Sequence, residues 1–356
     1  MNILGIGTVF SGGTGIARFE SSLQKGWVKP PEVDAKWAAG GKHPVYRVDL
    51  DAAPDKTLLK KIRRADRLSK MAVLGAAEAL KDGGIGDLRN VSLGVIVATA
   101  FGAHVTTFSF LDNILDYGDA AVSPTTFSNS VHNAAASYVS ESLTIKGPTL
   151  TITQFRFSFQ TALQLAGTWL DQRRCEYVLV GAVDQYGDVL GYVSNHKLTT
   201  AVDGKIKPFA FKPTCQVPGE GAAFFLLGRE RAEPPYCSAQ VSAIGEDAGQ
   251  LPSADIAIID ADGMLADESA YLASLPSEVP VAAYSPLFGS MMSGSAFNIA
   301  AGALMLKRRT HFAAPVQDNP HGLRLLTDAV SPRLGSIRCI GYDCYGKRAV
   351  VRLARG

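Results

Sequence analysis

Residues 147–169, GPTLTITQFRFSFQTALQLAGTW, join a run rich in β-branched residues to a segment that is apolar nearly all round. The β-branched residues of 150–153 favour a strand, and we expect this strand to be buried. The apolar stretch 160–169 predicts a helix enclosed by the protein, because a surface helix carries a polar face. The whole stretch therefore predicts a strand that leads into a buried helix.

The same alternation continues on both sides of this stretch. Short apolar runs predict further buried strands at 91–98, 177–182 and 223–227. Apolar residues at helical spacing predict a helix over 67–81, and a second helix that is apolar all round is expected over 296–306. Strands that alternate with helices from end to end argue for an α/β fold.

Two short segments suggest a duplication within the chain. MNILGIGTVFSG at 1–12 and AQVSAIGEDAGQ at 239–250 both read as a strand, an Ile-Gly pair and a loop, and each precedes a helix and a buried strand. A length of 356 residues also fits two packed units. We therefore expect two pseudo-repeats, 1–235 and 236–356, although two short matches can also arise by chance.

The composition argues against several classes of function. Hydrophobic residues make up 47% and charged residues 19% of the chain, which suits a large core or a large surface buried against a partner. A net charge of +2 is too small to argue for nucleic acid or a membrane surface, and no apolar run approaches the about 20 residues of a membrane span. No signal peptide is visible. Five widely spaced cysteines form no metal-ligand pattern, so we expect reduced thiols in a cytoplasm, and neither metal nor cofactor.

Five segments, in order along nearly the whole chain, resemble the β-ketoacyl synthases. They are RADRLSKMAVLGAAEALKDGGI at 64–85, GPTLTIT at 147–153, EYVLVGAVDQYGD at 176–188, KPFAFKPTCQVPGEGAAFFLL at 207–227 and IGYDCYGKRAVVRLAR at 340–355. Each match is weak alone, but five in the family's order are strong. The resemblance implies a thiolase-like, five-layered αβαβα fold built from the two pseudo-repeats.

The resemblance also implies which positions should carry the family's chemistry. A working ketosynthase holds its acyl chain on a cysteine at the N-terminus of the buried helix, and it uses two histidines and a lysine. Counting along the family motif from either side, the cysteine position is Arg156, and an arginine cannot be the nucleophile. No histidine occurs between 196 and 311, and no lysine between 212 and 307, where the other groups belong.

Other side chains stand at the two histidine positions. Asp262, in Ala-Asp-Gly, replaces the first, and Ser290 replaces the second, or Met292 if the gap moves. The resemblance therefore leaves no catalytic residue at these positions. A buried guanidinium needs a carboxylate, so we predict an ion pair between Arg156 and Asp262. The alternative is that Arg156 turns toward the surface or a partner.

Chain-length factors of type II polyketide synthases share these losses. Their first histidine motif becomes "ADG" and their second "GRLYSGxGPLDxAAA", and ADG at 261–263 and GSMMSGSAFNIAAGALML at 289–306 resemble both. They usually carry glutamine where this chain has Arg156, which suggests a divergent branch, such as one making aryl polyenes or anthraquinones. The resemblance implies a non-catalytic subunit that pairs with an active β-ketoacyl synthase in a heterodimer or heterotetramer. Its role would be to help set polyketide chain length, with an acyl carrier protein and its polyketide chain as further partners.

The resemblance further places the contact with the partner's acyl tunnel in 124–142, before the nucleophile strand. The residues expected to line the tunnel or the interface are Phe127, Ser128, Ser130, Val131, His132, Phe155 and Phe157. His132 can equally be structural, and Phe155 and Phe157 read first as packing residues. The basic run at 60–64 fits an acidic carrier protein or, equally, a solvated helix face.

Two other functions stay open. The chain could be a condensing or acyl-transfer enzyme with a displaced nucleophile, for instance Cys344 or Cys215. It could also be a purely structural paralogue with no part in chain length.

Overall fold

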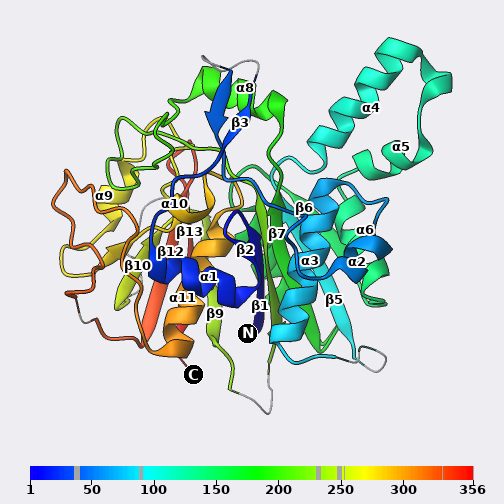
Figure 1. The fold of residues 1–356 in the computed structure, drawn as a ribbon. Helices are drawn as coiled ribbons and strands as arrows, with labels where there is room; N and C mark the ends of the chain where they lie inside the picture. The colour runs from blue at the N-terminus through cyan, green and yellow to red at the C-terminus, as the bar shows by residue number, and fades with distance from the viewer. Residues whose placement is uncertain are drawn as a thin grey trace.

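One large mixed β-sheet runs through the computed structural model, which describes residues 1–35, 41–86, 88, 91–229, 234–246, 251, 253–330 and 332–355 (Figure 1). Across the sheet the strands follow the order β11 (Val281–Ala282), β10 (Ile256–Ile259), β12 (Ser336–Tyr342), β13 (Arg348–Ala354), β9 (Cys237–Glu246), β1 (Asn2–Phe10), β8 (Gly221–Gly228), β7 (Tyr177–Asp184), β5 (Leu93–Thr99) and β6 (Thr149–Thr153). The short β2 (Gly13–Thr14) pairs with β1, and β3 (Glu32–Asp34) pairs with β4 (Lys42–Pro44) in a separate sheet.

The two halves of this sheet have the same topology. β1 is antiparallel to β8, β8 is antiparallel to β7, and β7, β5 and β6 are parallel. β9, β13, β12, β10 and β11 repeat this order and these directions. The halves meet where β1 pairs with β9 through Asn2–Ser238 and Ile3–Cys237. The repeated topology supports a duplication, and we propose that it divides the chain into 1–235 and 236–356.

Helices α7 (Ser158–Asp171) and α11 (Ser295–Arg308) form the middle layer. Each contacts strands of both halves: α7 packs on β5, β6 and β7 and also on β9 and β13, while α11 packs on β10, β12 and β13 and also on β1 and β8. As the sequence predicts, α11 is buried from Ser295 to Leu306. Helices α3 (Arg67–Asp82) and α6 (Ala134–Ser142) cover the outer face of the N-terminal half (Figure 1). The thiolase-like α/β architecture is therefore confirmed.

One expectation about the strands is wrong. β6 forms where the sequence predicts a strand, but the strand is not buried, and Leu150 is 41% exposed. β6 is the last strand of the sheet, so it pairs with β5 on one side and leaves its other edge open. Its β-branched residues favour a strand, but the periodicity of apolar residues does not distinguish a strand at the edge of a sheet from one at its centre.

Two glycines let α3 lie very close to β1. A Cβ atom on Gly7 would lie 2.1 Å from the carbonyl oxygen of Gly75, and one on Gly5 would lie 2.3 Å from that of Ala79. Both distances are far below a van der Waals contact, so no side chain fits there. This packing sets the position of α3, which carries Arg67 at its start.

The Gly-Glu-Gly motif before β8 makes a structural ion pair with α3. Arg67 Nε donates to both carboxylate oxygens of the fully buried Glu220, at 3.0 and 3.1 Å. Glu220 also accepts hydrogen bonds from the backbone N–H groups of Val48 and Tyr186. The carboxylate is therefore saturated, and it joins α3 to the segments that precede β8.

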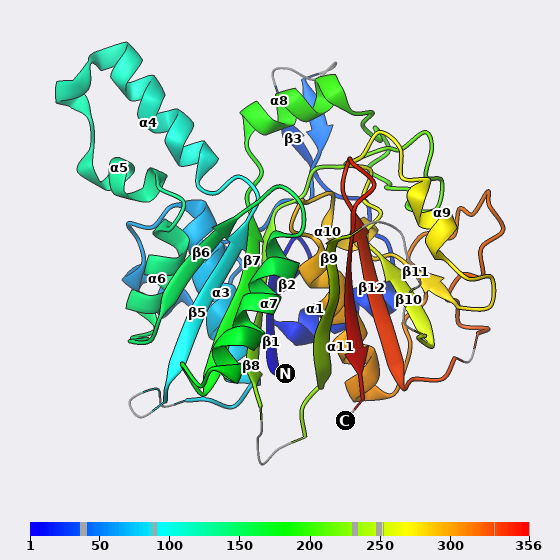
Figure 2. The same cartoon turned by 180° about the vertical axis from the view of Figure 1, so that it is seen from behind.

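A helical arm projects from the body of the protein. It consists of α4 (His104–Tyr117), the 3₁₀ turn Asp119–Ala121 and α5 (Pro124–Ser130), and it stands beyond the end of the sheet that holds β6 (Figures 1 and 2). We call residues 104–131 the arm. The other helices are α1 (Ile16–Lys25), α2 (Lys56–Lys61), α8 (Asp188–Lys197), α9 (Ala270–Ser274) and α10 (Ser285–Phe288). Within the described ranges, no helix combines the length and hydrophobicity needed to span a lipid bilayer.

Candidate functional site

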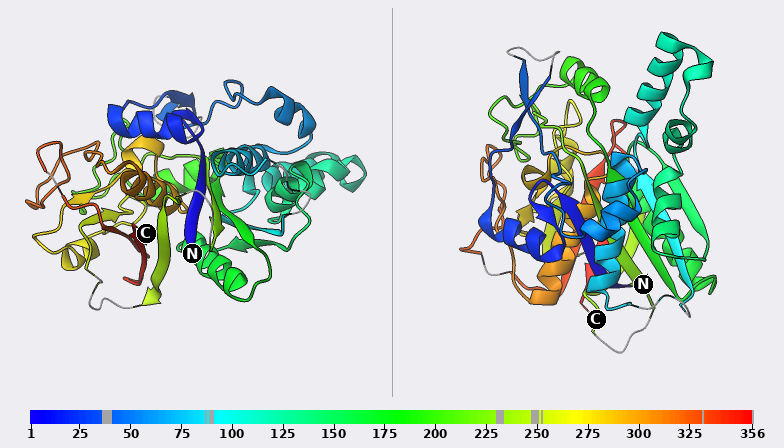
Figure 3. Two further views of the ribbon diagram at one scale, coloured as in Figure 1. Left: turned by 90° about the horizontal axis from the view of Figure 1, so that it is seen from below. Right: turned by 45° about the vertical axis from the view of Figure 1, so that its right-hand side comes forward.

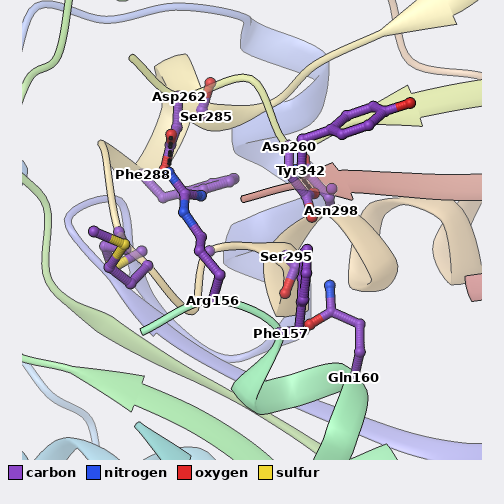
Figure 4. A pocket seen from close by; sticks show the side chains of 14 residues that line it. Arg156, Phe157, Gln160, Asp260, Asp262, Ser285, Phe288, Ser295, Asn298 and Tyr342 are labelled. Carbon is purple, nitrogen blue, oxygen red and sulfur yellow. Dashed lines mark hydrogen bonds and ion pairs between the residues drawn. The ribbon is translucent and has the colours of Figure 1, made fainter. Parts of the chain in front are cut away.

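The turn between β6 and α7 carries Arg156. Phe157, immediately before α7, has φ 64° and ψ 12°, a left-handed conformation that costs a non-glycine residue about 1–2 kcal/mol. Phe157 is buried, whereas Phe155 is 64% exposed. The turn therefore sends Phe155 outward and leaves Arg156 pointing toward the C-terminal half of the sheet (Figure 4). Strain of this kind is typical of functional sites, where the surrounding structure holds it in place.

Arg156 reaches the carboxylate of Asp262, which follows β10. Its Nη2 atom lies 3.4 Å from Asp262 Oδ1, and the two side chains are 12% and 6% exposed (Figure 4). The predicted ion pair is confirmed, and the alternative in which Arg156 turns to the surface is wrong. Among the described residues, the Nε atom of Arg156 has no hydrogen-bond partner.

Two further carboxyl groups, Asp260 and Glu268, lie near the same guanidinium. Asp260 accepts a hydrogen bond from Asn298 Nδ2 at 2.7 Å, and Glu268 accepts two from the backbone N–H groups of residues 262 and 263. Burial raises the pKa of Asp260 to about 7. Burial, together with the neighbouring Asp262 charge, raises the pKa of Glu268 to about 8. One guanidinium does not neutralise three carboxylates, so this cluster holds protons near neutral pH.

Ser290 lies against the backbone of Asp262. Its hydroxyl donates to the carbonyl oxygen of Asp262 and accepts from the backbone N–H of Val217 at 3.1 Å. The structure thus brings together Arg156, Asp262 and Ser290, although Arg156 and Ser290 are more than a hundred residues apart in the sequence. Met292 lines the same cavity as Arg156, so the choice between Ser290 and Met292 stays open.

Almost no space remains beside Arg156. The cavity there has a volume of about 10 Å³, which is room for about one water molecule. Arg156, Phe157, Phe288, Ser295 and Tyr342 are among the residues that line it (Figure 4). The N-terminal ends of α7 and α11 both reach this cavity, where helix dipoles favour negative charge. The resemblance to ketosynthases implies a thiolate at this position, whereas here the Arg156 guanidinium and the neighbouring carboxyl groups occupy it.

The described cysteines offer no replacement nucleophile in this cavity. Cys344 is exposed and Cys215 is half-buried, and neither lines the space beside Arg156. Burial raises the pKa of Cys175, Cys237 and Cys339, which disfavours their thiolate forms. In the described part of the chain, no set of three or more His, Cys, Asp and Glu side chains could hold a metal ion.

The residues expected to line the tunnel or the interface lie in two regions: one on α5 and the segment after it, the other beside Arg156. Phe127 is 56% exposed, and Ser128, Ser130, Val131 and His132 follow it along α5 and the segment beyond. The structure leaves Ser128, Val131 and His132 exposed and Ser130 partly covered. These residues therefore form one surface at the base of the arm.

The two phenylalanines next to Arg156 do not join that surface directly. Phe155 contacts the ring of Phe101, with centroids 5.2 Å apart, while Phe127 contacts Phe110 at 5.5 Å. Phe157 is buried in the wall of the Arg156 cavity. Its reading as a packing residue agrees with this position.

Sequence reasoning missed Asp260, Glu268, Asn298 and Gln160, which complete the site. Asp260 lies two residues before Asp262, and an acidic residue at the end of a buried strand is the one signal that could have drawn attention to it. Nothing local marks Glu268, whose role depends on the loop that folds back on Asp262.

Known proteins resemble this chain in sequence and in structure. The sequence profile described as "Beta-ketoacyl synthase, N-terminal domain" matches residues 1–233. The chain belongs to the β-ketoacyl synthase family. No curated protein matches its sequence significantly.

Solved β-ketoacyl synthase structures share the fold over the whole chain. A β-ketoacyl synthase from Burkholderia phymatum STM815 has a TM-score of 0.78 and 18% identity, with 100% of this chain and 99% of that chain covered. A type II PKS ketosynthase in complex with its acyl-carrier protein has a TM-score of 0.78 and 14% identity, covering 100% and 99%. The ishigamide ketosynthase/chain length factor has a TM-score of 0.78 and 15% identity, covering 100% and 98%.

Proposed function

We propose that this chain is a non-catalytic, chain-length-factor subunit that pairs with an active β-ketoacyl synthase and helps to shape its acyl tunnel. The observation that carries the proposal is the buried Arg156–Asp262 ion pair at the turn where a ketosynthase holds its nucleophile. An acyl thioester needs a thiolate and space for the acyl group, and this turn offers neither. Loss of the nucleophile, both histidines and the lysine together indicates a change of role.

Steric control of product length needs no catalytic group, so it can persist in an inactive subunit. Phe127, Ser128, Val131 and His132 are exposed and Ser130 is partly covered, and all but His132 belong to the arm. A surface that reaches into a partner's tunnel must be accessible in this way. Two of the structural neighbours are, by their names, a ketosynthase/chain length factor and a ketosynthase with its acyl-carrier protein. They support the same partners for this chain: a catalytic ketosynthase, and a carrier protein with its polyketide chain.

The proposal predicts that the isolated chain forms no acyl-enzyme. Purified protein incubated with a labelled acyl-carrier thioester, or with a cerulenin-like inhibitor, is expected to take up no label, because no cysteine lies in the Arg156 cavity. A catalytic ketosynthase serves as the positive control, and mass spectrometry detects any modified cysteine. Label on Cys215 or Cys344 that disappears in the Cys→Ser variant would instead establish the enzyme with a displaced nucleophile.

Product length should respond to side-chain size at the base of the arm. With the catalytic partner present, Ser130→Phe is expected to shorten the polyketide by at least one two-carbon unit, and Phe127→Ala is expected to lengthen it. Mass spectrometry of the released products measures both changes. Ser277→Phe, on an exposed loop of the C-terminal half, is the matched control and should change nothing. Unchanged products in all three variants, with the complex intact, would favour the purely structural paralogue.

A further inference from the structure

Helix α4 buries almost none of its side chains against the rest of the protein. Of its 14 residues only His104 is buried, and Leu115 and Tyr117 are 82% and 72% exposed. A stable surface helix normally buries one apolar stripe, and an exposed apolar cluster marks a contact surface. The right-hand view of Figure 3 shows the arm standing clear of the body. The exposed large apolar side chains of the arm are Phe108, Leu111, Leu115, Tyr117, Phe127 and Val131.

The arm is nevertheless held in a defined position. Thr106 Oγ1 donates to Asp66 Oδ2 at 3.0 Å, and Asn129 Nδ2 donates to the carbonyl oxygen of Arg64 at 2.7 Å. Within the arm, Thr107 Oγ1 donates to the carbonyl oxygen of residue 130 at 2.9 Å. These bonds join both helices to each other and to the body, so the apolar surface is presented ready for docking.

The polar part of this surface carries charge of one sign. Asp112, Asp116 and Asp119 are exposed, and from residue 91 to residue 145 the chain contains no lysine or arginine. Within the described residues, none of these three aspartates takes part in an ion pair. The arm therefore presents an apolar surface with an uncompensated acidic rim.

This acidic charge does not stabilise α4 itself. Asp112 and Asp116 are one turn apart, where like charges repel, and they lie toward the C-terminal end of the helix, where the helix dipole favours cations. The last turn of α4 contains no basic residue. These charges therefore do not help the helix to form. We look instead for a role in the contact between the arm and a partner.

We infer that the arm docks on a ketosynthase-fold partner whose facing surface carries lysine and arginine, and that its acidic rim opposes pairing with a second copy of this chain. The inference rests on the proposed function and adds the charge of the partner. If the arm of one chain packed on the same arm of a second copy about a two-fold axis, the two acidic rims would face each other. Like charges facing each other across an interface are strongly unfavourable, whereas opposite charges select the partner and speed its binding.

The test uses the tagged full-length chain co-expressed with the β-ketoacyl synthases of the same organism. The triple variant D112K/D116K/D119K is expected to bind the captured ketosynthase at least tenfold more weakly at 0.1 M salt. This difference should shrink at 1 M salt, where the screening length falls from about 10 Å to about 3 Å. The matched control D34K/E176K/D328K reverses three exposed acidic residues outside the arm and should bind like the wild type.

The controls separate the inference from a folding defect and from the proposed function. The variant should keep its circular dichroism spectrum, because lysine near the end of α4 suits the helix dipole. Capture that is equally strong in both triple variants overturns the inference and leaves the proposed function intact. If no ketosynthase is captured even by the wild type, the proposed function fails first and the inference with it. Sedimentation of the chain alone should show a monomer; a dimer that tightens at low salt overturns the inference, because the basic run at 60–64 would then be meeting the arm.

Discussion

Asp262→Ala is expected to lower the free energy of unfolding by about 3–5 kcal/mol, because it leaves the buried Arg156 guanidinium without its ion-pair partner. An arginine does not escape this cost by losing its proton, since its pKa is far above neutral. Chemical denaturation followed by circular dichroism measures the change. A loss under 1 kcal/mol would mean that Asp260 or Glu268 replaces Asp262 as the partner.

Arg156→Met is the matched variant for this pair, and its loss should be smaller and dependent on pH. When the arginine is removed, the buried Asp262 carboxylate can take up a proton and become neutral. This avoids the cost of leaving a buried charge without a partner. Burial already raises the pKa of Asp262, and without Arg156 it should rise further. The native state of the variant then keeps a proton that the unfolded state releases above about pH 4, so the loss of stability grows as the pH rises above about 4, up to the raised native-state pKa of Asp262. Equal losses in both variants at every pH would contradict this account.

Gly7→Ala is expected to cost about 3 kcal/mol or to prevent folding, because its Cβ atom would lie 2.1 Å from the carbonyl oxygen of Gly75. The clash involves two backbones, the strand β1 and the helix α3, so no side-chain rotation relieves it. Urea denaturation and the yield of folded protein measure the effect.

Gly167→Ala is the control for this substitution. Among the described residues, its added Cβ atom would meet only the sulfur of Met1, at 3.6 Å, which is an ordinary van der Waals distance. Since alanine favours a helix over glycine, the variant should be more stable by about 0.5–1 kcal/mol. If the two variants behaved alike, the close approach of α3 to β1 would not be a requirement of the fold.

Much of the fold could be predicted from the sequence, because its elements carry local patterns. The spacing of apolar residues in 67–81 predicts α3, and the Asp66 side chain that caps the helix lies where the pattern begins. The all-apolar stretch 296–306 predicts a helix of the middle layer, and α11 is buried along that whole stretch. The exposure of β6 and the projection of α4 could not be predicted. Both depend on what lies beside an element, and local periodicity contains no such information.

The site was predictable only where a family motif fixes a position. Counting along the motif places Arg156 at the turn before α7, and the Ala-Asp-Gly sequence places Asp262; the ion pair then follows from the cost of a lone buried charge. Glu268 and Asn298 are brought in by a loop and by a helix from other parts of the C-terminal half, and no spacing rule connects them to Asp262. The resulting excess of carboxyl groups emerges only in three dimensions.

The open edge of β6 has a consequence for the life of the chain in a cell. A terminal strand made of threonine, leucine and isoleucine, with unpaired backbone N–H and C=O groups, is a template for aggregation. Beside it stands the arm, whose large apolar side chains are exposed. Newly synthesised molecules that find no partner subunit would keep these surfaces exposed and would be bound by chaperones or degraded by proteases. The amount of such a subunit in the cell would then be limited by the amount of its partner, and the two chains would have to be synthesised in balanced quantities.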